Sequence, residues 1–132
     1  MTVSEHSNIP PDPASDDAYE LFKRGLSLLD DDHFAQATVS LEKAKRLEPD
    51  KTSIREALGR AYFRSGRYRN AAAEFSAVIE RSPANDYAHF CLGRSFEKLG
   101  DRSAASRHLS LACGMRPDRP DYQHYRDRLR AA

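Results

Sequence analysis

A spacing of 34 residues recurs through this chain and constrains its fold more than any other feature. Small, apolar and proline residues return at this interval without insertion or deletion. The aligned columns are Gly25, Gly59 and Gly93; Pro49, Pro83 and Pro117; Ala37, Ala71 and Ala105; Leu28, Tyr62 and Phe96; and Leu41, Phe75 and Leu109. A fixed period of this length indicates stacked structural repeats, so the 132 residues predict three repeats with a segment at each end.

Each repeat contains two stretches of helical apolar spacing. In the second repeat, apolar residues follow helical intervals from Ile54 and again from Tyr68. Gly66 and Gly100 stand where a residue in the left-handed conformation would end the first helix of a pair, whereas the first repeat has Asp32 in this turn. The recurrent proline ends the second helix because it cannot donate a backbone hydrogen bond. The expected N-caps of the following helices are Asp50, Asn85 and Asp118.

The small residues of the repeat have a packing role. Glycine at place 8 and alanine at place 20 of each repeat let its two helices approach closely, while larger residues at places 11 and 24 fill the space beside that contact. Together with proline at place 32, this pattern resembles the tetratricopeptide repeat over residues 18–119, although the tryptophan often found at place 4 is absent. The resemblance implies an all-α solenoid, a right-handed superhelix of helical hairpins.

The repeat register divides the chain into five parts. We expect an acidic, proline-containing and disordered tail over residues 1–15, repeats over 16–51, 52–85 and 86–119, and a capping helix over 120–132. The last segment has Tyr122, Tyr125 and Leu129 on one side of a helix and charged residues on the other. An open repeat stack needs such a terminal element with a polar outer side.

Sequence signatures of catalysis and cofactor binding are missing. The chain has no glycine-rich phosphate loop, HExxH, GxSxG or paired-cysteine motif, and its 5 histidines are scattered without ligand spacing. We therefore expect no enzyme activity, no cofactor and no metal site. Cys91 and Cys113 are too few for a disulfide framework. Without a secretory signal or an apolar run of about 18 residues, the chain is expected to be cytoplasmic, with no membrane partner.

The remaining candidate for function is a surface. In the tetratricopeptide family, the first helices of successive repeats line a concave groove that binds a segment of another protein, through places 2, 5, 9, 12 and 13. A helical wheel places these positions on one face, distinct from the core face. The candidate groove residues are Tyr19, Phe22, Leu26, Glu56, Arg60, Phe63, Arg64, Tyr87, Phe90, Arg94, Glu97 and Lys98.

The chemistry of these residues suggests a ligand. Arg60 is in register with Arg94, and Arg64 with Lys98, so the groove could bind a peptide that bears carboxylates and an apolar anchor. The alternative interpretation is that these are solubilising charges, partly neutralised by Glu56 and Glu97. Some family members hold chaperone C-terminal carboxylates through Lys and Asn residues. Here those places carry Phe22, Leu26, Ala57, Tyr87 and Cys91, which argues against that specificity.

Two other hypotheses use different surfaces. The apolar residues of the first repeat, Phe22, Leu26 and Leu29, could form a contact between copies of the chain. RNA binding is suggested by the predominance of arginine over lysine, but interleaved Asp and Glu residues argue against a phosphate track. The net charge of +1 divides unevenly, since residues 1–51 hold 6 basic and 11 acidic residues and residues 52–132 hold 15 and 9. The acidic tail could therefore dock in the basic groove of its own chain or of a neighbour.

Overall fold

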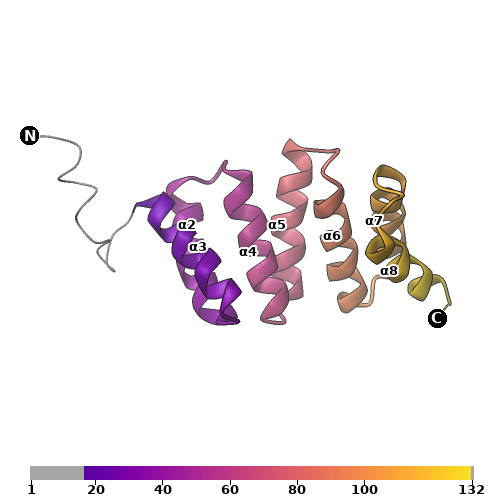
Figure 1. Cartoon of the computed structure of the whole chain (residues 1–132), viewed down its shortest axis with the longest axis horizontal. Coiled ribbons are helices and arrows are strands. Elements are labelled where there is room, and N and C mark those ends of the chain that lie inside the picture. Colours follow the sequence, from indigo (N-terminus) through magenta and orange to yellow (C-terminus); the bar gives the residue numbers. More distant parts are fainter. Residues whose placement is uncertain (1–16, 132) are drawn as a thin grey trace, which may run out of the picture.

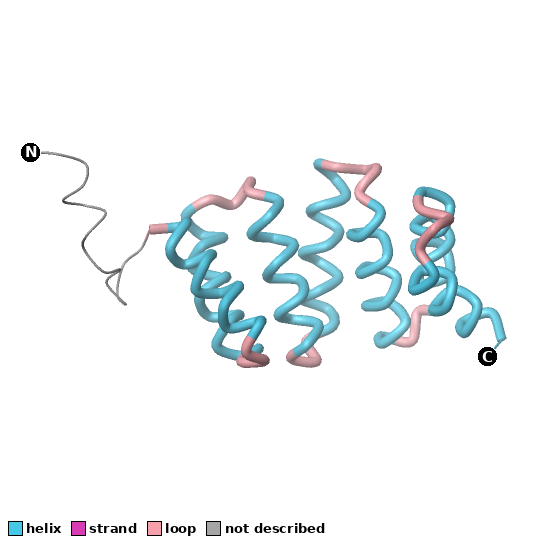
Figure 2. The backbone as a smooth tube through the Cα atoms, viewed as in Figure 1, coloured by secondary structure: helices cyan, strands magenta, loops and turns pink. Residues whose placement is uncertain are grey.

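The computed structural model describes residues 17–131, which form helices joined by short turns. The helices are α2 (Ala18–Asp30), α3 (Phe34–Leu47), α4 (Thr52–Arg64), α5 (Tyr68–Arg81), α6 (Asp86–Leu99), α7 (Arg102–Met115) and α8 (Pro120–Ala131). They stand side by side in chain order, with α2 and α3 at one end of the row and α7 and α8 at the other (Figure 1). The described part is helical throughout apart from the connecting turns (Figure 2), so the prediction of an all-α repeat solenoid is confirmed. The predicted tail over residues 1–15 lies outside the described residues.

The turns inside the helical pairs have the expected backbone conformation. Gly66 and Gly100 have φ angles of 78° and 85°, and Asp32 has a φ of 62° at the corresponding turn of the first pair. Glycine adopts this left-handed region without cost because it has no Cβ, whereas Asp32 carries a Cβ into it. The three turns reverse the chain at the same point of each pair, which keeps the pairs in one register.

The glycine column marks the closest approach of the helices within each pair. A methyl group at Gly25 would lie 2.5 Å from Cγ of Leu41, and one at Gly59 would lie 2.8 Å from Cζ of Phe75. Leu41 and Phe75 are almost fully buried, so neither can move aside into solvent. The predicted close packing of the paired helices is therefore confirmed, and it brings the first helices into one face of the array.

Two of the three predicted N-caps are wrong. Asn85 does cap α6, because its side chain accepts a hydrogen bond from the Ala88 amide at 3.0 Å. Asp50 instead accepts a hydrogen bond from Arg81 at 2.6 Å, and α4 begins after Lys51 without a side-chain cap. Asp118 likewise pairs with Arg116, at 2.9 Å. Both aspartates stand one residue before the N-cap place, which is Lys51 in α4 and Asn85 in α6.

Polar contacts join the first two pairs of helices. Glu74 is only 5% exposed and accepts hydrogen bonds from Lys45 at 2.7 Å and from Arg55 at 3.1 Å. Its two partners lie on α3 and α4, so one buried carboxylate connects three consecutive helices. A buried charge is tolerated when it is paired in this way, and removing one partner leaves the others uncompensated. This triad fixes the position of α4 against α3.

The last helix packs as a further layer of the array. Tyr122 is fully buried, and its ring stacks on Phe90 with centroids 4.7 Å apart. Its hydroxyl donates to Asp86 at 2.6 Å, and Leu129 is buried against the α7 residues Ala105 and Leu109. Helix α8 therefore covers the apolar end of α6 and α7, as expected of a capping helix. Within residues 17–131, no helix is long and apolar enough to cross a membrane.

Candidate functional site

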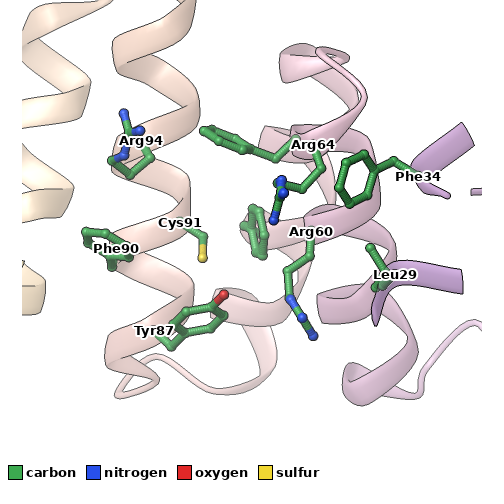
Figure 3. Close-up of a pocket in the computed structure, with 10 residues that line it drawn as sticks. Leu29, Phe34, Arg60, Arg64, Tyr87, Phe90, Cys91 and Arg94 are labelled. Carbon is green, nitrogen blue, oxygen red and sulfur yellow. The ribbon is translucent and has the colours of Figure 1, made fainter. Parts of the chain in front are cut away.

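A cavity of about 240 Å³ opens between the first helices of the pairs, and we call it the groove pocket. Its walls come mainly from α4 and α6, with single residues from α2, α3 and α5 (Figure 3). The lining residues are Leu29, Phe34, Arg60, Phe63, Arg64, Phe75, Tyr87, Phe90, Cys91 and Arg94. Apolar and aromatic groups form most of this lining, and the charged groups are all arginines.

Half of the predicted groove residues line this pocket. These six are Arg60, Phe63, Arg64, Tyr87, Phe90 and Arg94. The structure therefore brings together the predicted residues of α4 and α6 that are aromatic or carry arginine. None of the candidates in α2 belongs to the lining, but Leu29 in its last turn does, and it stands at place 12 of the first repeat, one of the predicted groove places.

The other predicted residues lie around the pocket or away from it. Phe22 and Leu26 are half-buried and pack against the hydrophobic core, whereas Tyr19 is 63% exposed at the start of α2. Glu56 is half-buried on α4, and Lys98 is exposed near the end of α6. The apolar patch expected on the first repeat is thus largely used in packing within the chain.

Three lining residues were not predicted from the sequence as part of the groove. Phe34 begins α3, Phe75 lies in the middle of α5, and Cys91 is a buried residue of α6 at place 6, outside the five groove places. The groove prediction used only the first helix of each repeat, so it excluded Phe34 and Phe75 from the start. Phe75 was identified as a core residue, and it is 1% exposed at the base of the pocket.

Aromatic rings and arginine side chains alternate around the pocket. The Arg64 guanidinium lies 4.3 Å from the ring centroid of Phe34, and Arg94 lies 5.5 Å from that of Phe63. Phe63 also meets Tyr68 edge to face at 5.2 Å. Stacking on a ring orients a guanidinium while leaving its N–H donors available in the plane. The pocket therefore presents apolar surface beside oriented hydrogen-bond donors.

The three arginines differ in how far their charge is already neutralised. Arg94 donates to Glu97 at 2.6 Å, and Glu97 also accepts from Arg128 of α8 at 3.1 Å. Arg64 lies 3.9 Å from Asp32, and both side chains are well exposed. Arg60 forms no ion pair or hydrogen bond with any residue in the described range 17–131. Among the arginines that line the pocket, Arg60 is therefore the one without an acidic side chain at ion-pair distance in this range.

The capping helix engages the third-repeat end of the groove. Tyr125 of α8 lies 4.0 Å from the Arg94 guanidinium and 5.6 Å from the Phe90 ring. With Arg128 bound to Glu97, this helix takes up predicted groove residues that the sequence interpretation had left open to a ligand. The pocket that remains accessible lies between α4 and α6.

Two titratable lining residues of the pocket, Tyr87 and Cys91, carry no charge at neutral pH. Burial raises the pKa of the Cys91 thiol to about 12, and burial also raises the pKa of the neighbouring Tyr87 hydroxyl. Both groups stay protonated at neutral pH, so Cys91 is a poor nucleophile here. Among the residues that the structure describes, no group of three or more His, Cys, Asp or Glu could hold a metal ion. The arrangement suits binding of an amphipathic group.

Known proteins share this repeat. A family model described as "Tetratricopeptide repeat" matches residues 22–86 and again residues 56–120. TPR repeat-containing thioredoxin TTL4 of Arabidopsis thaliana is 29% identical over 107 residues, which cover 81% of this chain and 16% of that protein. The chain thus spans about one sixth of the length of that relative.

Solved structures have the same arrangement of helices. MamA (41-end) from Desulfovibrio magneticus RS-1 superposes with a TM-score of 0.85 at 18% identity, over 89% of this chain and 66% of that one. The first TPR of Spaghetti (RPAP3), solved with the HSP90 peptide SRMEEVD bound, gives 0.81 at 14% identity, over 86% of this chain and 90% of that one. Because the two family matches together span residues 22–120, the chain belongs to the tetratricopeptide repeat family.

Proposed function

We propose that this chain is an adaptor that binds an extended segment of a partner protein in the groove pocket. The segment carries a bulky apolar side chain, which enters the pocket, and a carboxylate, which pairs with an arginine at its edge. The observation that carries this proposal is the position of Arg60. It is a charged side chain without an acidic partner in the described range, beside a cavity lined by aromatic rings.

The energetics favour such a ligand. A hydrogen bond between a guanidinium and a carboxylate stabilises a complex more than a neutral pair does, roughly twice as much. Burying the apolar side chain among Phe34, Phe63 and Phe75 adds the hydrophobic contribution, and aromatic and arginine residues are the usual anchors of interfaces. A cavity of about 240 Å³ suits one or two side chains of a linear segment rather than the face of a folded domain.

The fold is compatible with peptide binding, since the structure of the first TPR of Spaghetti (RPAP3) contains a bound HSP90 peptide. The specificity proposed for this chain is different, because Phe22, Leu26 and Ala57 stand at places where chaperone-binding family members have Lys or Asn. We therefore propose recognition of a partner through Arg60 and the aromatic lining rather than through that clamp.

Affinity capture followed by peptide scanning tests the proposal. The wild type, Arg60→Glu and the control Arg69→Glu are used to capture proteins from a lysate of the native host, and overlapping peptides of each captured protein are then titrated. Arg69 lies on α5 outside the pocket lining and is exposed. We expect peptides that bind the wild type and Arg69→Glu equally and Arg60→Glu weakly. Equal binding to all three variants would rule out the groove pocket.

A further inference from the structure

The arginine of the groove pocket is one member of a column that continues into the capping helix. Arg60, Arg94 and Arg128 are separated by 34 residues, so they occupy the same place on α4, α6 and α8. Helix α8 therefore keeps the register of a first helix, although it has no glycine at the corresponding place. The same side chain recurs along one face of the array at successive layers.

We call the space between the arginines of two consecutive layers a gap. The gap between Arg94 and Arg128 already holds a carboxylate. Glu97 of α6 accepts from Arg94 of its own helix at 2.6 Å and from Arg128 of the next layer at 3.1 Å. Each carboxylate oxygen accepts from one guanidinium: Oε1 accepts from Arg94, and Oε2 accepts from Arg128. A single carboxylate thus satisfies arginines from two layers.

The preceding gap lacks this carboxylate. The position that corresponds to Glu97, one repeat earlier, is Phe63, which lines the groove pocket. The two arginines that would flank a carboxylate there are Arg60 and Arg94, and both line the pocket too. Arg94 keeps unused donors after binding Glu97, because a guanidinium has five N–H groups. The repeat symmetry thus puts two arginines on either side of a position where the chain has a phenyl ring in place of a carboxylate.

We propose that the bound segment fills this gap with one carboxylate, which accepts hydrogen bonds from Arg60 and Arg94 as Glu97 does from Arg94 and Arg128. The proposal rests on the proposed function of the groove pocket. The ligand is then a segment with one acidic residue next to a bulky apolar residue, rather than a run of acidic residues, because Glu97 already occupies the following gap. The apolar side chain enters the pocket beside the Phe63 ring.

A library of random nine-residue peptides provides the test. It is displayed in two forms, with a fixed linker after the peptide and with a free C-terminus, and is selected on the wild-type protein. We expect enrichment of Asp or Glu beside a bulky apolar residue in the linked form. Enrichment confined to the free form would assign the same site to a terminal carboxylate.

The enriched sequence is then synthesised with a fluorescent label, together with a partner peptide in which the acidic residue is changed to its amide. The acidic peptide should bind the wild type about tenfold more tightly than the amide peptide, the effect of a charge-assisted hydrogen bond worth 1.5 kcal/mol or a little less. Arg60→Gln should reduce this difference, because only Arg94 then remains to donate to the carboxylate, and the control Arg69→Gln should preserve it. Equal affinity of the acidic and amide peptides would overturn the carboxylate site and leave the proposed function standing. Selection of no peptide in either form would overturn both.

A pair of variants at Phe63 tests the gap without any ligand. Phe63→Glu introduces a carboxylate at the place equivalent to Glu97, whereas Phe63→Gln makes the same change of shape without charge. We expect the Glu variant to unfold at a higher urea concentration than the Gln variant at neutral pH. Adding Arg60→Gln to both should reduce the difference, because only Arg94 then remains beside the new carboxylate. If the Glu variant is no more stable than the Gln variant, Arg60 and Arg94 do not converge on this gap and the proposal is wrong.

Discussion

Replacing Gly25 by alanine tests whether close helix packing in each pair depends on the glycine column. The added methyl carbon would lie 2.5 Å from both Cγ and Cδ2 of Leu41. Carbon atoms prefer separations of about 3.5–4.0 Å, so the overlap is about 1 Å at two atoms. Leu41 is fully buried, and overpacking of this kind costs about 1–3 kcal/mol. We expect a cost near the upper value, about 3 kcal/mol, because the overlap involves Cγ, the branch point of the Leu41 side chain.

Part of this cost is offset by helix propensity. Alanine is more favourable than glycine inside a helix by about 1 kcal/mol, so the free energy of unfolding should fall by about 2 kcal/mol. For a domain of this size the midpoint of thermal unfolding should fall by about 8 °C. Circular dichroism during heating measures the midpoint, and urea titration measures the free energy.

Two further variants separate the overlap from the change of residue type. Gly114→Ala in α7 is the matched control, because a methyl group there meets nothing within 4 Å, and we expect it to stabilise the protein by about 0.5 kcal/mol. Leu41→Ala removes the atoms that the new methyl group would strike, so the double variant Gly25→Ala/Leu41→Ala should be more stable than the two single effects would give. Additive single effects, or a Gly25→Ala protein as stable as the wild type, would refute the packing argument.

Three other perturbations have defined outcomes. Asp32→Gly should raise the free energy of unfolding by about 0.5–1 kcal/mol, since glycine relieves the φ of 62°, and urea titration measures it. His108 stacks on His89, with their Nδ1 atoms 3.1 Å apart, and its pKa is lowered by burial and by the His89 charge. The unfolded state therefore binds more protons below about pH 6.5, so stability should fall as the pH falls, and His108→Gln should weaken this dependence in urea titrations at about pH 7.5 and 5.5. Light scattering should give the mass of one chain at all concentrations, because the half-buried Phe22 and Leu26 pack against the core of their own chain. A mass that rises with concentration and falls in Tyr19→Ser would support association through the first repeat.

The fold could be predicted from the sequence because the 34-residue period and the local helix and turn patterns indicate the same helical pairs. The small residues at places 8 and 20 predict close packing of the two helices, and the structure shows that the residue facing Gly59 is Phe75 at place 24. The positive φ of Asp32 was anticipated only because Gly66 and Gly100 stand in the equivalent turns. The N-cap prediction was wrong at Asp50, because the N-cap place of α4 falls one residue later, at Lys51, in register with Asn85.

The site could be predicted only in part from the sequence, because its contacts join residues of different layers of the array. A helical wheel gives the direction of Arg60 and Arg94 on their own helices, but it says nothing of neighbours from other layers. Arg94 is neutralised by the Glu97 carboxylate, which also binds Arg128 of the next layer. Tyr125 of α8 contacts Arg94 and so covers the end of the groove at the third repeat. Phe34 enters the pocket because the second helix starts beside Arg64. These contacts follow from the superhelical stacking of the layers, which the period implies but does not describe in detail.

The attachment of α8 links the groove pocket to the C-terminal end of the array. A terminal helix with one neighbouring layer can detach while the rest stays folded, so its amides should exchange with solvent faster than those of α4. Arg94 and Phe90 line the pocket and also hold Tyr125 of α8. A segment bound in the pocket would orient Arg94 and thereby lower the frequency with which α8 detaches. Slower hydrogen exchange in α8 would then report occupancy of a pocket that the helix does not itself line.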